Sequence, residues 1–366
     1  MKADIVVVGN GPTAWLAGLA LGGLGLDVMA VAPAAARGPD PRTIALMPSS
    51  VEALARLGVD VRPHATALTG LVIETSGPFG LVSQRFTAAD AGEAYLAQNL
   101  PVADLVDLMP PGRVIGSTLA ALDFTPGRTT VVTAAGDRIA ARLVVAADGL
   151  ASPTREAAGI ALRRRPLAAR AWCAPAELER PHGRLCRERY DDEGTLTVIP
   201  VGERGASLIS IAPDAADPAR SQERLSRRQP AYGSIRVVGA AAVFPLSISW
   251  APRPVARRVV AVGEAAHVAP PIGAQGWNMA VRDVVVLREV VAAAVAAGAD
   301  IGGGEVLARY ARQRGPDLAA RISAVGALAG LAITPAGPLR LARQAGLLAL
   351  SGMPGAKRRL MRAGLR

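Results

Sequence analysis

An uncharged stretch of 22 residues, from Ile5 to Leu26, limits the folds that this chain can adopt. A stretch of this length could cross a bilayer or serve as a signal peptide. It contains six glycines, however, only Lys2 precedes it as a basic residue, and its first four residues favour a strand. We therefore predict a buried strand, a helix to about Leu24 and a second strand over Val28–Val31, with no transmembrane segment.

The first predicted strand ends in the motif Gly9-x-Gly11-x-x-Ala14. In a dinucleotide-binding turn, the first glycine allows the tight turn, the second lets the backbone approach a pyrophosphate, and the small third residue lets helix pack on strand. The acid expected after the second strand, which would bind an adenosine ribose, is replaced by Ala32 and Pro33. The motif alone leaves open a generic turn without a ligand.

Composition excludes several classes of protein. With 366 residues, 51% hydrophobic and 19% charged, the chain is globular and long enough for two units. The net charge of +11 comes from 39 arginines and two lysines, and twelve aromatic residues are too few for a base-stacking platform, so we predict no nucleic-acid binding. Cys173 and Cys186 lack zinc-site spacing, so we expect buried thiols in a reducing compartment and no metal site.

Further along the chain the pattern of elements changes twice. A hairpin is expected first, then short alternating runs typical of an antiparallel sheet, then a return to the α/β pattern, and finally a helical tail. The expected ranges are 129–133 and 138–147 for the hairpin, 195–200 and 206–211 for two of the sheet strands, 258–263 for a strand and 277–297 for a helix. The tail from 301 to 366 is expected to break at Gly315-Pro316, 335–338 and 352–355.

Two further motifs join the N-terminal one. Asp148-Gly149-x-x-Ser152-x-x-Arg155 lies in the middle of the chain, and Gly263-Glu264-Ala-Ala-His267-x-x-Pro-Pro271-x-Gly273-x-x-Gly276-Trp277-Asn278 lies late in it. In this order the three motifs resemble those of flavoprotein aromatic hydroxylases related to para-hydroxybenzoate hydroxylase. Within that family, the chain looks most like the ubiquinone-biosynthesis hydroxylases.

The resemblance implies an α/β fold, with a Rossmann-like FAD-binding domain, an inserted antiparallel β-sheet substrate domain and a C-terminal helical tail. The implied FAD-binding domain covers residues 1–72, 95–162 and 250–300, the substrate domain covers 73–94 and 163–249, and the helical region covers 301–366.

The resemblance also implies a set of FAD-binding residues. Pro271, Gly273, Gly276, Trp277 and Asn278 would line the flavin ring, and Glu264 stands where the family usually has an aspartate that holds the ribityl chain. Other implied contacts are Arg42 near the diphosphate, Asp148, Gly149 and Arg155 in the central motif, and Gly9, Gly11, Ala14 and Gly263 in the turns. Four residues of these segments also have a simpler interpretation. Asp148 or Glu264 could cap a helix, Arg42 could be a solvated side chain, and His267 could be a packed structural histidine.

The implied activity is that of an FAD-dependent monooxygenase, whose flavin hydroperoxide transfers oxygen to the ring of a polyprenyl-phenol. The co-substrates would be molecular oxygen and an electron source, either NADH, NADPH or a protein reductant. Three alternatives stay open: another aromatic or isoprenoid substrate, a flavin reductase of prenyl chains, and a non-catalytic flavin-binding subunit of a quinone-synthesis complex.

The C-terminal tail intersperses arginines with leucines. This pattern suits an anionic membrane surface, and an ordinary solvated helix face explains it equally well. The expected location is the cytoplasm or the inner face of the cytoplasmic membrane. The sequence is silent on oligomeric state.

Overall fold

The fold is taken from a computed structural model that describes the chain apart from residues 34–39, 111, 216, 334–336 and 366. Its first sheet has eight strands: β1 (Lys2–Val8), β2 (Val28–Ala32), β8 (Arg113–Gly116), β9 (Leu119–Thr125), β10 (Arg128–Thr133), β11 (Arg138–Ala146), β18 (Val255–Ala256) and β19 (Val259–Ala261). The order is β18-β19-β11-β1-β2-β8, and the neighbours from β19 to β8 run parallel. β9 and β10 extend this sheet as an antiparallel hairpin.

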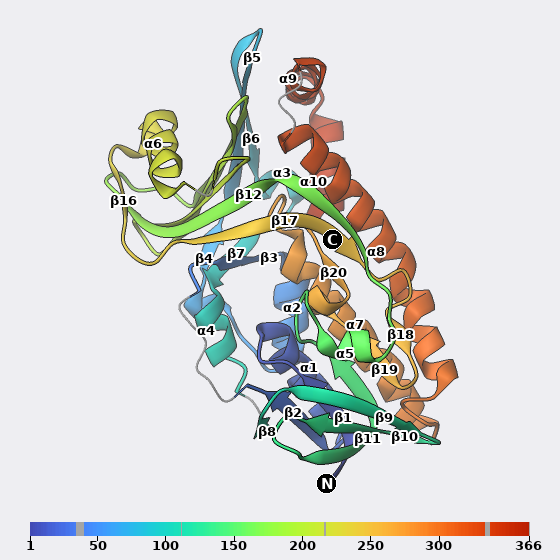
Figure 1. Ribbon diagram of the computed structural model, residues 1–366. Helices are drawn as coiled ribbons and strands as arrows, with labels where there is room; N and C mark the ends of the chain where they lie inside the picture. The colour runs from blue at the N-terminus through green and yellow to red at the C-terminus, as the bar shows by residue number, and fades with distance from the viewer. Residues whose placement is uncertain (34–39, 111, 216, 334–336, 366) are drawn as a thin grey trace.

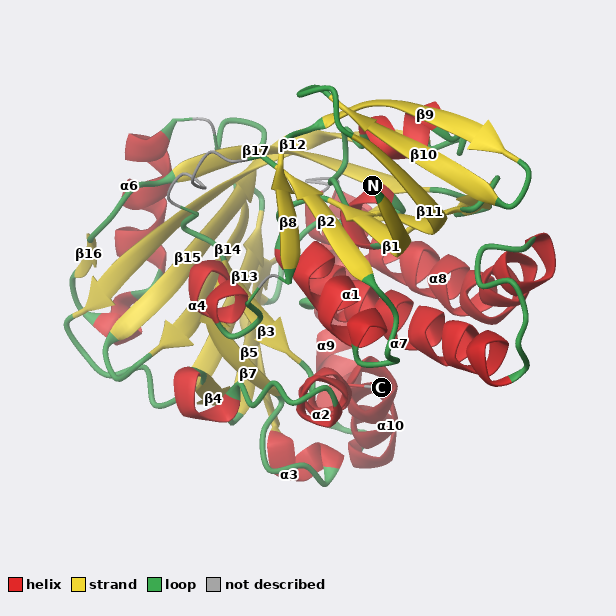
Figure 2. Ribbon diagram, turned by 90° about the horizontal axis from the view of Figure 1, so that it is seen from below, coloured by secondary structure: helices red, strands yellow, loops and turns green. Residues whose placement is uncertain are grey.

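Alternation along the parallel strands divides their side chains between two cores. Ile5 and Val7 on β1 face one core, and Val6 and Val8 face the other. Because both faces of the sheet are covered, these strands are almost continuously apolar, and this pattern makes them recognisable in the sequence. Figure 2 shows helices α1 (Pro12–Gly22), α7 (Gln275–Ala296) and α8 (Gly304–Ile333) covering one face of the sheet.

The second sheet has nine strands and arches over the first (Figure 1). Its strands are β5 (Gly70–Gly77), β6 (Gly80–Thr87), β12 (Arg163–Leu178), β13 (Leu185–Asp191), β14 (Gly194–Val201), β15 (Gly205–Ala212), β16 (Ile235–Val237), β17 (Ala242–Trp250) and β20 (His267–Val268). The order is β20-β17-β12-β15-β14-β13-β5-β6, with β16 beside β12. Helix α6 (Pro218–Arg228) packs on the outer face through Leu225.

Smaller elements connect the two sheets. They are a three-stranded sheet of β3 (Thr43–Leu46), β7 (Ala97–Pro101) and β4 (Thr66–Leu68), and helices α2 (Pro48–Arg56), α3 (Ala88–Ala91), α4 (Val102–Asp107) and α5 (Pro153–Ala157). Single helical turns lie at Arg62–His64, Pro230–Tyr232 and Gly263–Ala265. Helices α9 (Gly337–Ser351) and α10 (Pro354–Leu365) complete the C-terminal region.

The predicted N-terminal βα unit is confirmed, and no helix in the described residues is long and apolar enough to cross a membrane. The predicted hairpin, sheet strands, late strand and long helix are also present, with ends displaced by a few residues. Both cysteines are buried free thiols, and burial raises the pKa of Cys173 to about 12.

Two expectations about helices are wrong. Helix α8 runs through Gly315-Pro316 without a break, because buried Tyr310, Leu318 and Ile322 hold both halves against the core. This packing compensates for the hydrogen bond that a proline removes. Helix α6 was not expected at all, since its composition is strongly polar. The break after Ser351 is confirmed, and the one at 335–338 falls partly outside the described residues.

Candidate functional site

The three motifs follow the carboxyl ends of three adjacent parallel strands. Val8 on β1 pairs with Ala146 on β11, which in turn pairs with Ala261 on β19. The loops that follow these strands therefore emerge at one edge of the sheet, where open α/β folds bind their ligands.

The loops are in direct contact with one another. A Cβ atom added to Gly9, whose φ is +139°, would lie 2.3 Å from the carbonyl oxygen of Ala147, immediately before the central motif. A Cβ added to Gly263 would lie 2.8 Å from Cγ2 of Thr13 on the first helix. Arg155 of the central motif donates from Nη1 to the carbonyl oxygen of Ala265 at 3.4 Å. The structure thus assembles the three motifs into one site.

On the outer side of these loops the glycines face open space. A Cβ added to Gly11, Gly149, Gly273 or Gly276 would meet no other atom within 4 Å, in contrast to Gly9 and Gly263. Pro271 and Gly273 are exposed. The packed glycines serve the fold, whereas the open ones leave a cradle in which a pyrophosphate and a flat ring can approach the backbone. The residues present therefore fit FAD.

Helix α7 begins at this cradle. No side chain caps its first turn, and Ala274, which precedes it, has a left-handed φ of 53°. The free N–H groups of the first turn place partial positive charge at the loop. Asn278 holds this geometry, because its Nδ2 donates to the carbonyl oxygens of Ala45 at 2.9 Å and Ala274 at 2.6 Å, and its Oδ1 accepts from the Met47 amide at 2.9 Å.

Several predicted contact residues are occupied by protein partners. Asp148 accepts from the hydroxyl of Ser152 and from the amide of Thr154 at 3.0 Å, so it caps the turn into α5. Arg155 is buried and donates to the Leu150 carbonyl at 2.8 Å. Trp277 packs against the main core beside α1. These three side chains support the loops of the cradle from the protein interior. Ala14 is buried in the main core against which Trp277 packs.

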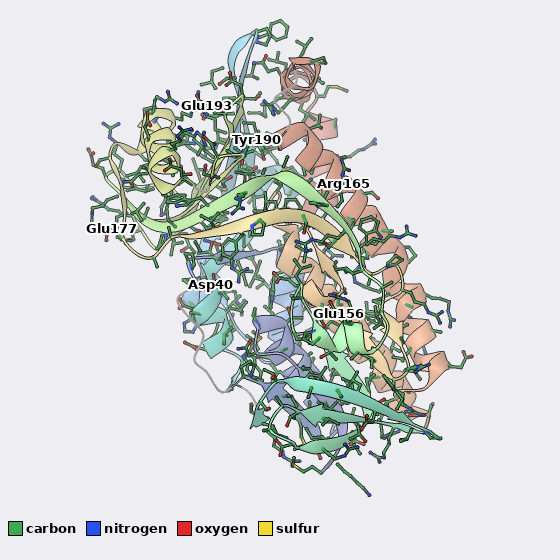
Figure 3. The ribbon with its side chains drawn as sticks, viewed as in Figure 1. Asp40, Glu156, Arg165, Glu177, Tyr190 and Glu193 are labelled. Carbon is green, nitrogen blue, oxygen red and sulfur yellow. The ribbon has the colours of Figure 1, made fainter. Side chains whose placement is uncertain are left out.

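Arg42 lies at the rim of the cradle. It donates from Nε and Nη2 to Asp40 at 2.8 and 2.7 Å, lies 3.9 Å from the exposed carboxylate of Glu264, and stacks 5.0 Å from the ring centre of Phe244. Figure 3 labels Asp40, which lies below the second sheet. Burial opposes ionisation of Asp40, but the hydrogen bonds from Arg42 outweigh it and hold the pKa of this carboxyl below its usual value. Arg42 and Glu264 thus link the first sheet's loops to the second sheet.

A buried polar network supports the late loop from below. Asp283 on α7 accepts from the Gly263 amide at 2.9 Å and from Arg314 Nε at 2.6 Å, and it lies 2.6 Å from His267 Nε2. Burial raises the pKa of Asp283, but His267, Arg314 and the amide bond outweigh burial, and the net pKa is lowered. His267 is therefore a packed structural histidine. Asp283 was not among the site residues expected from the sequence, although a carboxylate followed by the apolar run Val284–Leu287 could have revealed it.

The inner face of the second sheet closes the site from above. Ile272 of the late loop packs in one cluster with Leu246 and Ile211 of the sheet and Ala329 and Ala332 of α8. Phe244 and Tyr190 border this cluster. We define these seven residues as the apolar wall, which joins the late loop through Ile272.

One polar pair lies at the far end of the apolar wall. The Tyr190 hydroxyl donates to the carboxyl of Glu188, the residue two positions earlier on β13 (Figure 3 labels Tyr190). Burial raises the pKa of both groups. Neither Tyr190 nor Glu188 was among the site residues expected from the sequence.

Comparison with known proteins agrees with this geometry. A family model described as an FAD binding domain matches residues 123–323. The ubiquinone hydroxylase UbiL of Rhodospirillum rubrum is 30% identical over 98% of this chain and 89% of its own length. The 3-demethoxyubiquinol 3-hydroxylase of Escherichia coli is 28% identical over 58% of this chain and 56% of its own length.

A solved structure shows the same fold. The p-nitrophenol 4-monooxygenase PnpA of Pseudomonas putida superposes with a TM-score of 0.84 and 20% identity, over 100% of this chain and 98% of that one. Together with the near full-length match to UbiL and a family model that spans more than half of the residues, this shows that the chain belongs to the FAD-dependent monooxygenases of the ubiquinone-biosynthesis hydroxylase family.

Proposed function

We propose that this protein hydroxylates the aromatic ring of a polyprenyl-phenol intermediate in ubiquinone synthesis. The observation that carries the proposal is the joining of three motifs into one open cradle beneath an apolar wall, in a chain similar to UbiL over almost its whole length. UbiL is named as a ubiquinone hydroxylase, and the wall offers the apolar surroundings that a prenylated ring needs.

When bound and reduced by NADH, NADPH or a protein reductant, FAD supplies the activation of molecular oxygen. The chain's part is to bind, orient and exclude water. Gly11 would hold the diphosphate against the N-terminus of α1, while Gly9 and Ala14 shape the turn behind it and Arg42 lies at the rim. The free N–H groups in the first turn of α7 would stabilise negative charge on the ring. Ile272 and the apolar wall keep water away from the reacting face.

We propose the same residues for FAD binding as those expected from the sequence, with two modes of action. Gly11, Gly149, Gly273, Gly276 and Pro271 approach the cofactor through their backbone. Asp148, Arg155, Trp277 and Asn278 act by fixing the loops, because their polar groups or rings already contact the protein. The division into an FAD-binding domain, a substrate domain and a helical region remains part of this proposal, with β5 joining the substrate sheet at Gly70.

The proposed working place is the cytoplasmic side of the membrane in which the substrate dissolves, alone or within a quinone-synthesis complex. Support comes from the C-terminal segment, since residues 318–366 contain eight basic residues and no acidic one. Such a segment is attracted to anionic lipid.

The test is oxygen incorporation by the purified protein. With FAD, NADH and a detergent-dispersed polyprenyl-phenol under ¹⁸O₂, we expect a product that gains one labelled oxygen atom and is absent when FAD is omitted. A product that gains hydrogen without label would show a prenyl reductase, and no reaction with any electron donor would favour a non-catalytic subunit. Either outcome contradicts the proposal.

A further inference from the structure

Large apolar side chains are exposed on the β5–β6 hairpin and on helices α9 and α10, which pack against one another. Phe79 and Leu81 at the turn between β5 and β6 are 60% and 54% exposed, and Leu341 and Leu348 on α9 are 44% and 46% exposed. With Met353 and Leu360 they make up six of the eleven large apolar side chains that the described residues expose. Isolated exposed leucines are ordinary, but a group of this size marks an interaction surface.

The turn and α9 form a single rigid support for these side chains. Gln344 of α9 donates from Nε2 to the Gly80 carbonyl at 2.8 Å, and its Oε1 accepts from the Phe79 amide at 3.4 Å. Leu347 packs against Val82 and Phe86 of the hairpin. Figure 1 shows the hairpin tip and α9 projecting side by side at the top of the molecule. Leu341 and Leu348 are seven residues apart, so they share one face of α9 next to Gln344.

Helix α10 is anchored to the base of the same hairpin. Lys357 pairs with Asp90 at 2.9 Å, and Arg362 donates to the Ala91 carbonyl at 3.4 Å. Arg358 and Arg359 on α10 are exposed. No acidic residue follows Asp317 in the sequence, so the charged side chains of α9 and α10 are all basic.

We propose that Phe79, Leu81, Leu341, Leu348, Met353 and Leu360, together with the basic side chains Arg358 and Arg359, form a docking face for an anionic phospholipid bilayer. A bilayer fits because the apolar groups stand on separate projections, a hairpin tip and a helix stripe, which can each enter the headgroup region. Basic residues beside them are attracted to anionic headgroups. A protein partner would need a matching surface for both projections.

This docking face is continuous with the site. Arg343 of α9 donates to Thr75 Oγ1 at 2.8 Å and to the Leu331 carbonyl at 2.9 Å, and its guanidinium lies 5.8 Å from the ring centre of Tyr190. Tyr190 borders the apolar wall that begins at Ile272 of the late loop. The wall therefore leads from the cradle to the base of α9. That a membrane-dissolved substrate enters from this end rests on the proposed function, whereas the docking face does not.

The test is sedimentation of the FAD-loaded protein with vesicles of phosphatidylcholine, with or without about one third phosphatidylglycerol. We expect binding to the anionic vesicles that weakens in high salt, and little binding to neutral ones. The double variant Phe79→Asp with Leu348→Glu should bind at least about tenfold more weakly, since two apolar anchors are lost. The matched control is Val238→Glu, which charges a valine that is 44% exposed just after β16, and it should bind like the parent.

Both variants should keep the parent's flavin content and its rate on a short-chain, water-soluble phenol, which shows that they are folded. Equal binding of the double variant and the parent, or an equal loss in the control, would overturn the docking face. Absence of vesicle binding by the parent would do so too, and would leave this surface to a protein partner. Vesicle binding without hydroxylation would instead contradict the proposed function and leave the docking face standing.

Discussion

Replacing Asp283 with asparagine is expected to lower the free energy of unfolding by about 3–5 kcal/mol, the range seen when one partner of a buried ion pair is removed. Arg314 and His267 are both buried, and without the carboxylate the guanidinium loses its buried counter-charge. The single side-chain oxygen of asparagine cannot accept from both Arg314 and the Gly263 amide, so the late loop is held less firmly and FAD should be released more easily. Chemical denaturation and the flavin content after gel filtration measure the two effects.

The control for this variant is Asp317→Asn, which removes the other carboxylate that Arg314 contacts. Asp317 is 39% exposed, so water can replace it, and a loss below about 1 kcal/mol is expected. The pKa of Asp283 is lowered in the folded protein. The ionised carboxylate therefore adds to the free energy of unfolding at any pH above the unfolded pKa of about 3.9, and this stabilisation is lost as the pH falls through the folded pKa. Equal losses in both variants would show that the buried network does not support the loop.

Replacing Gly11 with valine should abolish FAD binding while leaving the fold intact. The backbone of Gly11 has φ −83° and ψ 172°, which any residue adopts, and a Cβ there meets no protein atom within 4 Å. The added side chain instead fills the space proposed for the diphosphate, so we expect FAD affinity to fall by at least about a hundredfold, or ~2.7 kcal/mol. Quenching of flavin fluorescence in a titration measures this.

Two other glycines serve as comparisons. Gly9→Ala should destabilise the protein itself, because the new Cβ would lie 2.3 Å from a backbone oxygen at a φ of +139°. Gly18→Val on α1 also points into open space, but away from the cradle, and should keep normal FAD affinity. If Gly11→Val bound FAD as the parent does, the diphosphate would not lie at this turn.

The parts of the fold that the sequence predicted are those fixed by local pattern. Continuous apolar runs ending in glycine mark β1 and β19, since a strand buried on both faces needs apolar residues throughout. The family resemblance implied that the three motifs form one site, and the structure explains this because the parallel strands before them end at one edge of the sheet.

The features that the sequence did not predict depend on tertiary contacts. Pro316 does not break α8 because distant core residues hold the helix, and the roles of Asp283 and Asn278 depend on partners such as Arg314 and Ala45 far along the chain. The approach of Arg42 to Phe244 likewise depends on how the second sheet packs over the first. A single sequence carries no local signal for such contacts.

The proposed role in ubiquinone synthesis is tested by the quinone-lipid profile, measured by mass spectrometry, of an aerobically grown strain of the source organism that lacks this gene. We predict loss of ubiquinone and accumulation of a prenylated precursor that lacks one ring oxygen, with recovery by the parent gene and none by the Gly11→Val form. A normal ubiquinone level with no accumulated precursor would contradict the proposed role in ubiquinone synthesis.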